Sequence, residues 1–147
     1  MDWSYVAGLF DGEGSVTFLK NKGSFHLMIS ISASHQPTRQ ALEEFLTQRG
    51  ISSSTSTTKN PLGQSSRIVI ENWDGARKFC HAILPYVIEK KRHIAIVFKI
   101  FQLRTKVALN DEMFISHTAE FDALRQELHA LANKGPSLKR EWENTFK

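Results

Sequence analysis

The stretch Tyr5-Val6-Ala7-Gly8-Leu9-Phe10-Asp11-Gly12-Glu13-Gly14-Ser15 decides the fold of this chain. Trp3, Val6 and Phe10 recur at i, i+3 and i+7, a spacing that predicts a short helix with one apolar side. Two glycines bracket Glu13, and they end the helix because glycine tolerates the dihedral angles of a chain reversal. The stretch therefore predicts a helix that ends in an acidic residue.

The other side of this helix carries small residues. Ser4 and Gly8 lie there, and the stripe continues through Ala7, Asp11 and Gly12. So flat a face lets a second helix approach backbone to backbone, by a steric rule best attested in membranes but equally valid in water. The small residues therefore predict a helix–helix contact.

Beyond this helix the hydrophobic period changes to two. The alternation from Ser15 to Ser34 predicts a hairpin that turns at residues 20–23, with one apolar and one polar face. A helix then opens near Pro37 and stops at Gly50. Strands over 52–59 and 66–70 form a second hairpin, although the Ser/Thr-rich run could also be a low-complexity linker. Threonine's preference for strands favours the hairpin.

Three helices are predicted in the remaining chain. The first runs from Gly75 to about Leu84, with Asn72 or Asp74 as its cap. Pro85 breaks it, and amphipathic helices over about 89–106 and 116–133 follow. The coarse order is helix, hairpin, helix, hairpin and three helices.

Composition limits the class of protein. A chain of 147 residues with 41% hydrophobic composition has enough apolar material for one compact domain or two closely fused halves. No window approaches the roughly 18 apolar residues of a membrane span, and the N-terminus lacks the pattern of a secretory signal. Cys80 is the only cysteine, which excludes an internal disulfide and a thiolate metal cage. We expect a soluble, intracellular protein without a membrane partner.

Charge is distributed unevenly along the chain. The formal net charge is +4, yet the first 14 residues contain three acids and no base. Residues 15 to 70 contain six bases and two acids. An acidic spot beside a basic middle is typical of a cation site next to a surface that binds a polyanion. The alternative is a mildly basic soluble domain with no nucleic-acid role.

The segment from Tyr5 to Ser15 closely resembles the signature of the LAGLIDADG homing endonucleases. The resemblance implies an α+β fold with an αββαββα core, an antiparallel four-stranded saddle sheet and C-terminal helices. It extends to about residue 106, so we expect a single endonuclease domain over 1–147 with a helical extension from about 107. One motif per chain resembles the homodimeric branch, and the implied self-contact uses Ser4, Ala7, Gly8 and Asp11, with Asp11 also serving the helix end.

The resemblance also implies the reaction, which is Mg²⁺-dependent, site-specific cleavage of double-stranded DNA at a long pseudo-palindromic target, leaving short 3′ overhangs. Phosphodiester hydrolysis needs an activated water and shielding of transition-state charge, and divalent cations supply both. Glu13 is the implied metal ligand, helped by the carbonyl of Gly12. Many members have Asp at this position, but Glu keeps the charge and the oxygen ligands that Mg²⁺ prefers. The alternative is that Glu13 is a solvated turn residue.

Two further catalytic residues are implied by local matches to the family. Residues 84–92 resemble the segment that leads into the long helix, and the match makes Lys90 the catalytic lysine. Three cations at the start of a helix oppose its dipole, and a nearby phosphate would relieve that cost. A match at residues 34–39 makes His35 the polar residue that orders water, with Gln36 as a close contender.

The polar face of the predicted sheet is the candidate DNA-reading surface, because two-stranded ribbons fit the major groove. Lysines hold phosphates, while hydroxyls, His and Arg read base edges. The candidates are Ser15, Thr17, Lys20, Lys22, Ser24, His26, Ser30, Ser32, Thr57, Lys59, Gln64 and Arg67. The alternatives are an ordinary solvated face, and, for the whole protein, an RNA-splicing maturase, a non-cleaving DNA-binding regulator or a structural interaction domain.

Overall fold

The computed structural model describes residues 1–21, 24–107 and 117–132, and these form an α+β fold. The N-terminal elements are α1 (Trp3–Glu13), β1 (Gly14–Asn21), β2 (Ser24–Ser32) and α2 (Gln36–Gln48). They are followed by β3 (Ser54–Asn60), β4 (Gly63–Ile70), α3 (Trp73–Ile83), α4 (Lys91–Val107) and α6 (Thr118–Ala132). The predicted αββαββα order is confirmed, and the Ser/Thr-rich run is strand β3 rather than a linker.

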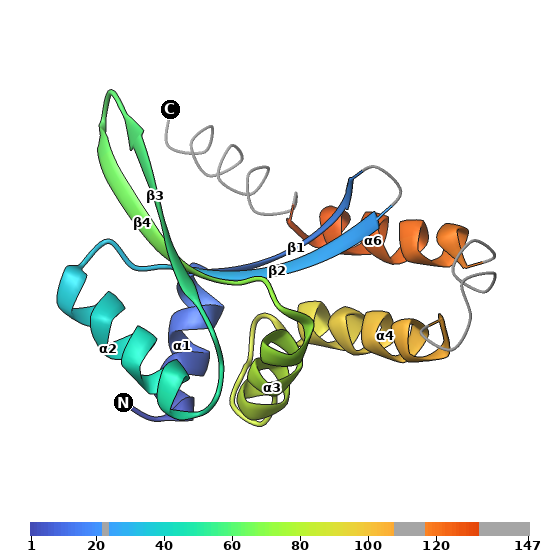
Figure 1. Cartoon of the computed structure of the whole chain (residues 1–147), viewed down its shortest axis with the longest axis horizontal. Helices are drawn as coiled ribbons and strands as arrows, with labels where there is room; N and C mark the ends of the chain where they lie inside the picture. Colours follow the sequence, from blue (N-terminus) through green and yellow to red (C-terminus); the bar gives the residue numbers. More distant parts are fainter. Residues whose placement is uncertain (22–23, 108–116, 133–147) are drawn as a thin grey trace, which may run out of the picture. The chain divides into compact units, whose positions relative to one another are not determined.

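The four strands form one antiparallel sheet in the order β1-β2-β4-β3. Each hairpin is paired along its full length, but β2 pairs with β4 only where Ile29–Ser32 lie opposite Arg67–Ile70. Beyond this short seam the two hairpins separate, as Figure 1 shows. The sheet is therefore two ribbons joined at the middle.

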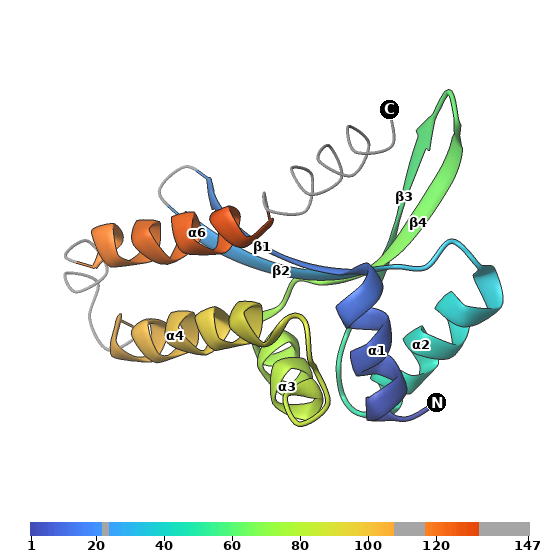
Figure 2. The ribbon, with the colours of Figure 1, turned by 180° about the vertical axis from the view of Figure 1, so that it is seen from behind.

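Helices α1, α2 and α3 lie on one side of the sheet, which is seen from both directions in Figures 1 and 2. The strands present alternate apolar residues toward this side, including Leu27, Ile29 and Ile31 of β2, all almost fully buried. Aromatic rings join the helices, since the ring of Phe10 lies edge-on to that of Phe79 with centroids 5.7 Å apart. This core fixes α1 against the sheet.

Ala7 belongs to this core. The sequence placed it on the small-residue side of α1, but its side chain is fully buried within the chain, as are those of Val6 and Phe10. Helical periodicity explains the difference, because residue 7 lies between the apolar stripe and the small stripe, and α1 packs deeply enough to bury it. The expectation that Ala7 offers surface to a partner was therefore wrong.

Both ends of α1 are held by local contacts. Asp2 caps the N-terminus, where its carboxylate accepts a hydrogen bond from the Tyr5 N–H at 2.8 Å. At the other end the N–H of Gly14 donates to the Phe10 carbonyl, and β1 begins at that same glycine. A Cβ at Gly14 would lie 2.5 Å from the Phe10 carbonyl oxygen and 2.8 Å from Phe10 Cε2. Only glycine lets the helix pass directly into the strand.

Gly14→Ala should therefore destabilise the protein. Overpacking against Phe10 should lower the free energy of unfolding by about 1–3 kcal/mol. Denaturant unfolding at fixed protein concentration measures the loss, and Gly12→Ala is the control because a Cβ at Gly12 would meet no atom within 4 Å. Equal stability of the two variants would show that the contact with Phe10 does not require glycine.

The described chain divides into two compact units, with a boundary at Ile94 inside α4. The second unit contains the remainder of α4 and α6, whose predicted extents differ from the observed ones by only a few residues. No described helix is long and apolar enough to cross a membrane. Cys80 is buried in α3, and burial raises the pKa of its thiol to about 12, so the sulfur stays protonated in the core.

Candidate active site and nucleic-acid interface

Glu13 is the last residue of α1, and its side chain is exposed. Within the part of the chain that the structure describes, its carboxylate has no hydrogen-bond or ion-pair partner. Gly12 precedes it, and a side chain there would meet nothing within 4 Å, so the backbone at this corner is open to approach. The helix thus ends in a free carboxylate beside accessible backbone.

Asp11 connects this corner to the segment between α3 and α4. Its Oδ2 accepts a hydrogen bond from the Ile88 N–H at 2.8 Å, and its Oδ1 accepts one from the Lys90 N–H at 3.1 Å. The sequence assigned Asp11 to the helix end and the dimer contact. The structure adds these two intrachain bonds, which sequence spacing could not reveal because they join residues almost eighty positions apart.

Lys90 lies at the foot of α1. Its Nζ donates to the main-chain carbonyl of Asp11 at 2.6 Å and lies 5.8 Å from the centroid of the Phe10 ring. His93, one turn further along, has a buried Nδ1 without a hydrogen-bond partner among the described residues. Burial, and then the charge of Lys90, lower the pKa of His93, which keeps that imidazole neutral at pH 7. The Lys90 ammonium is therefore a positive charge held at the end of α1 by a hydrogen bond.

His35 lies three residues beyond β2 and caps α2. Its Nδ1 shares a hydrogen bond of 2.8 Å with the Thr38 hydroxyl, and the side chain is exposed. The other ring nitrogen, Nε2, has no hydrogen-bond partner among the described residues. Gln36 is the first residue of α2, and its side chain is also exposed. Both residues that the sequence nominated for ordering water stay candidates, and one ring nitrogen of His35 is already bonded to the Thr38 hydroxyl.

No group of three His, Cys, Asp or Glu side chains suited to a metal ion occurs among the described residues. The donor set at the foot of α1 consists of one carboxylate, that of Glu13, and the neighbouring carbonyl of Gly12. Oxygen donors of this kind fit Mg²⁺, which keeps several ligands from water and substrate phosphates. These two oxygen donors fit a divalent cation in kind, and they leave most of its ligand positions to other groups.

The sheet face opposite the helices carries most of the predicted DNA-reading residues. The register sets Ser15 opposite Ser30 and Ser32 opposite Arg67, so these side chains share one face. Alternation puts Thr17, Ser24 and His26 on the same face. Ser30, however, is buried and its hydroxyl shares a hydrogen bond of 2.7 Å with that of Ser15. Ser30 therefore supports the face rather than reading from it.

Three residues of the second hairpin were predicted on this face wrongly. Thr57 pairs with Ser66 and Lys59 with Gln64. Ser66 and Gln64 lie one and three residues before Arg67 on β4, which is an odd number of residues in each case. Thr57, Lys59 and Gln64 therefore point to the opposite face, since side chains alternate along a strand. Lys20 also lies on that opposite face, with its Nζ 5.7 Å from the Phe25 ring centroid. Lys22 lies outside the described residues.

Sequence reasoning missed the true neighbours of Arg67. Ser56 lies directly opposite Arg67, and Thr58 pairs with Ser65 on the same face. All three are at least partly exposed hydroxyl residues. The turn at residues 60–63 could have predicted these neighbours. Asn60 pairs with Gly63 around a two-residue loop, and this pair sets the register of all the other β3–β4 pairs.

Arg67 is the cation at the centre of this face. It lies at the seam between the hairpins, between Ser32 of β2 and Ser56 of β3. Its Nε is buried and has no hydrogen-bond partner among the described residues. The buried Nε is out of reach of a ligand, but Arg67 as a whole is only partly buried, and a guanidinium on an otherwise hydroxyl-rich surface suits an acceptor such as a base edge.

The small-residue face of α1 is exposed in the isolated chain. Ser4 and Gly8 are exposed, and a Cβ at Gly8 would meet no atom within 4 Å. Tyr5, beside them, is half exposed. The chain's own packing therefore gives no reason for glycine at position 8.

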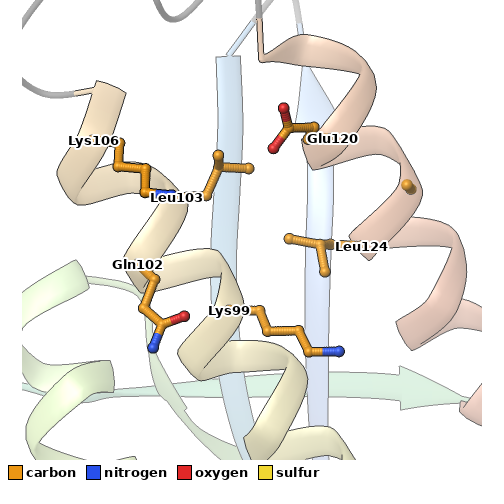
Figure 3. Close-up of a pocket in the computed structure, with 7 residues that line it drawn as sticks. Lys99, Gln102, Leu103, Lys106, Glu120 and Leu124 are labelled. Atoms are coloured by element: carbon orange, nitrogen blue, oxygen red, sulfur yellow. The ribbon is translucent and has the colours of Figure 1, made fainter.

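The second unit contains a hollow of about 310 Å³ between α4 and α6, drawn in Figure 3. Lys99, Gln102 and Lys106 line it from α4, and Glu120 and Leu124 line it from α6. No predicted site residue lies in it. The candidate site is therefore not this hollow but the corner formed by α1, β1 and the segment before α4.

Comparison with known families decides the identity. The model of the LAGLIDADG-like domain matches residues 2–83, more than half of the chain. This chain belongs to the family of LAGLIDADG-like domains. The match begins at the α1 cap and ends with α3, so it covers the whole sheet of this LAGLIDADG protein.

Solved structures of similar fold agree. The homing endonuclease I-CvuI, in complex with DNA in the presence of Mg, is 14% identical, with 88% of this chain and 80% of that chain covered and a TM-score of 0.67. The archaeal intron-encoded I-Vdi141I, complexed with DNA, is 18% identical, with 88% and 82% covered and a TM-score of 0.67. The LAGLIDADG homing endonuclease I-GzeII, in complex with its DNA target, is 17% identical, with 85% of this chain and 44% of that chain covered and a TM-score of 0.68. The curated proteins contained no match.

Proposed function

We propose that this LAGLIDADG protein is a site-specific double-strand DNA endonuclease that acts as a homodimer and depends on Mg²⁺. The observation that carries the proposal is the carboxylate of Glu13 at the C-terminal end of α1, which has no partner among the described residues, with the Lys90 ammonium bonded to the same helix end. A carboxylate kept free of intrachain partners suits a ligand role. A nearby ammonium suits a scissile phosphate.

Each residue has a distinct task in this proposal. Glu13 and the Gly12 carbonyl would hold Mg²⁺, which when bound activates water and shields charge on the phosphate. Lys90 stabilises negative charge on the phosphate in the transition state, and His35 or Gln36 orients water. The cut strands end in short 3′ overhangs, as expected for this family.

The hydroxyl-rich sheet face around Arg67 would lie in the major groove. Serine and threonine hydroxyls donate to or accept from base edges, and the Arg67 guanidinium can bind guanine through two hydrogen bonds. A homodimer would set two such faces on one duplex, so its target is pseudo-palindromic.

Dimerisation would bring the two α1 helices together through Ser4 and Gly8. One chain supplies one Glu13 carboxylate and one Gly12 carbonyl. Two chains would double both. The exposed Gly8 supports this contact, because its missing side chain is not needed by the chain's own fold.

Incubation with a randomised DNA library in Mg²⁺, followed by sequencing of cut ends, tests the function. We expect cuts at one pseudo-palindromic site that disappear with EDTA. Specific binding without any cut would favour the non-cleaving regulator, and binding restricted to intron RNA would favour the maturase. The free Glu13 favours cleavage over both.

Arg67→Ala and Lys59→Ala should separate base reading from charge. Arg67→Ala should cost about 1–3 kcal/mol of binding and relax preference at one base pair in each half-site. Lys59 faces the other side of its hairpin, so Lys59→Ala should lower the salt slope by at most about one unit and leave base preference intact. Binding across salt on single-base target variants measures both, and identical specificity profiles for the two variants would refute the division.

A further inference from the structure

We propose that Asp11 is the positioning residue of Lys90. It holds the Lys90 ammonium at the C-terminal end of α1, beside the place where the scissile phosphate would lie. The inference rests on the nuclease function proposed above and deepens it. It assigns to Asp11 a task inside one chain.

The contacts form a closed clamp. The two carboxylate oxygens of Asp11 accept from the N–H groups of Ile88 and Lys90, at 2.8 and 3.1 Å. In return the Lys90 Nζ donates to the Asp11 carbonyl at 2.6 Å. Three hydrogen bonds between the same two short segments fix both the backbone and the side-chain end of Lys90.

The way these bonds are divided preserves the charge of Lys90. The Asp11 carboxylate is used by backbone N–H groups, while the ammonium binds a neutral carbonyl. A direct ion pair with the carboxylate would cancel most of the field that the ammonium offers to a phosphate. An ammonium has three donors, so two are left after the bond to Asp11.

Lys90 needs such a clamp because it does not belong to a regular element. It lies just before α4 begins at Lys91, and its neighbours Ile88 and Glu89 are exposed. A lysine side chain has large rotamer freedom, and small misplacements of a catalytic group reduce rate steeply. The clamp uses the α1 end, whose partial negative charge also favours a cation. Glu13 lies two residues after Asp11 on the same helix. Helix α1 therefore fixes the position of the Glu13 carboxylate and, through Asp11, that of the Lys90 ammonium.

A double-mutant cycle tests the inference. Asp11→Ala and Lys90→Met should each lower the single-turnover cleavage rate about 100-fold, with the Kd for target DNA changed less than about threefold. Because Asp11 acts through Lys90, the double variant should be within about threefold of Lys90→Met rather than the roughly 10⁴-fold slower rate of independent sites. Asp74→Ala is the matched control, since the partners of that exposed carboxylate within the described chain are the Arg77 and Lys78 side chains.

Amide hydrogen exchange gives a second readout that does not need activity. Exchange at Ile88 and Lys90 should speed up at least about tenfold in Asp11→Ala while exchange in the β2–β4 seam stays unchanged. Should that variant fail to fold, Asp11→Asn, which keeps one acceptor, should show intermediate losses in both measurements.

The failures are distinguishable. Multiplicative losses in the cycle, or unchanged exchange at both amides, would overturn the positioning role and leave the nuclease function standing. If the unaltered protein cut no DNA, the nuclease function would fail, and exchange alone would decide whether Asp11 holds Lys90.

Discussion

Glu13→Gln should abolish DNA cleavage while the Kd for target DNA changes little. The substitution keeps the size of the side chain but removes the charge that a divalent cation requires. Because Glu13 is exposed and has no partner in the described chain, the fold should not depend on its carboxylate. We expect at least a ~10³-fold fall in single-turnover rate, a size typical of losing a group central to transition-state stabilisation.

Paired measurements make this result specific. Binding is measured in Ca²⁺ and cleavage in Mg²⁺, on the same target duplex. Glu44→Gln is the control, since it makes the same chemical change at an exposed position on α2. Full cleavage by Glu13→Gln would remove the metal-ligand role. A parallel loss of binding would point instead to a structural or DNA-contact role.

Gly8→Leu should convert the protein to a monomer and thereby remove double-strand cleavage. The isolated chain should accept leucine, because Gly8 is exposed, a Cβ there would meet no atom within 4 Å, and leucine favours the helix more than glycine does. Two leucines between facing α1 helices would force the backbones apart. Sedimentation should show a dimer for the unaltered protein and a monomer for the variant, with a ~100-fold or greater loss of cleavage because each site is then incomplete.

Ala41→Leu on the exposed side of α2 is the control for adding one exposed leucine. It should leave both the sedimentation and the cleavage unchanged. An unaltered protein that cuts as a monomer would contradict the homodimer, as would a Gly8→Leu variant that stays dimeric and active.

Local signals predicted the fold well. The 3.6-residue spacing of Trp3, Val6 and Phe10 and the two-residue alternation of the hairpins are recorded in the sequence itself, and the sheet follows from them. The end of α1 at Glu13 was also predicted, from the glycines on either side of it, but the reason differs: Gly14 has extended dihedral angles, and glycine is needed there because a Cβ would collide with Phe10.

Predictions that depended on tertiary context were weaker. Thr57, Lys59 and Gln64 were chosen for polarity, but alternation along the strand decides which face a side chain occupies. Gln64 lies three residues before Arg67 on one strand and therefore faces the other way, while the faces of Thr57 and Lys59 depend on the register set by the turn. Ala7 was misplaced because the depth of helix packing is not encoded in spacing. The hydrogen bonds between Asp11 and Lys90 join segments that lie far apart in the sequence, so no local sequence pattern could predict them.

The loop-free passage from α1 to β1 has a consequence for how such a site can be tuned. Glu13 ends the helix and Gly14 begins the strand, so no intervening residue can shift the backbone toward or away from a phosphate. The only adjustable length at this corner is that of the acidic side chain. A glutamate, one methylene longer than aspartate, changes the reach of the carboxylate while the architecture stays the same, and evolution can exchange the two without redesigning either element.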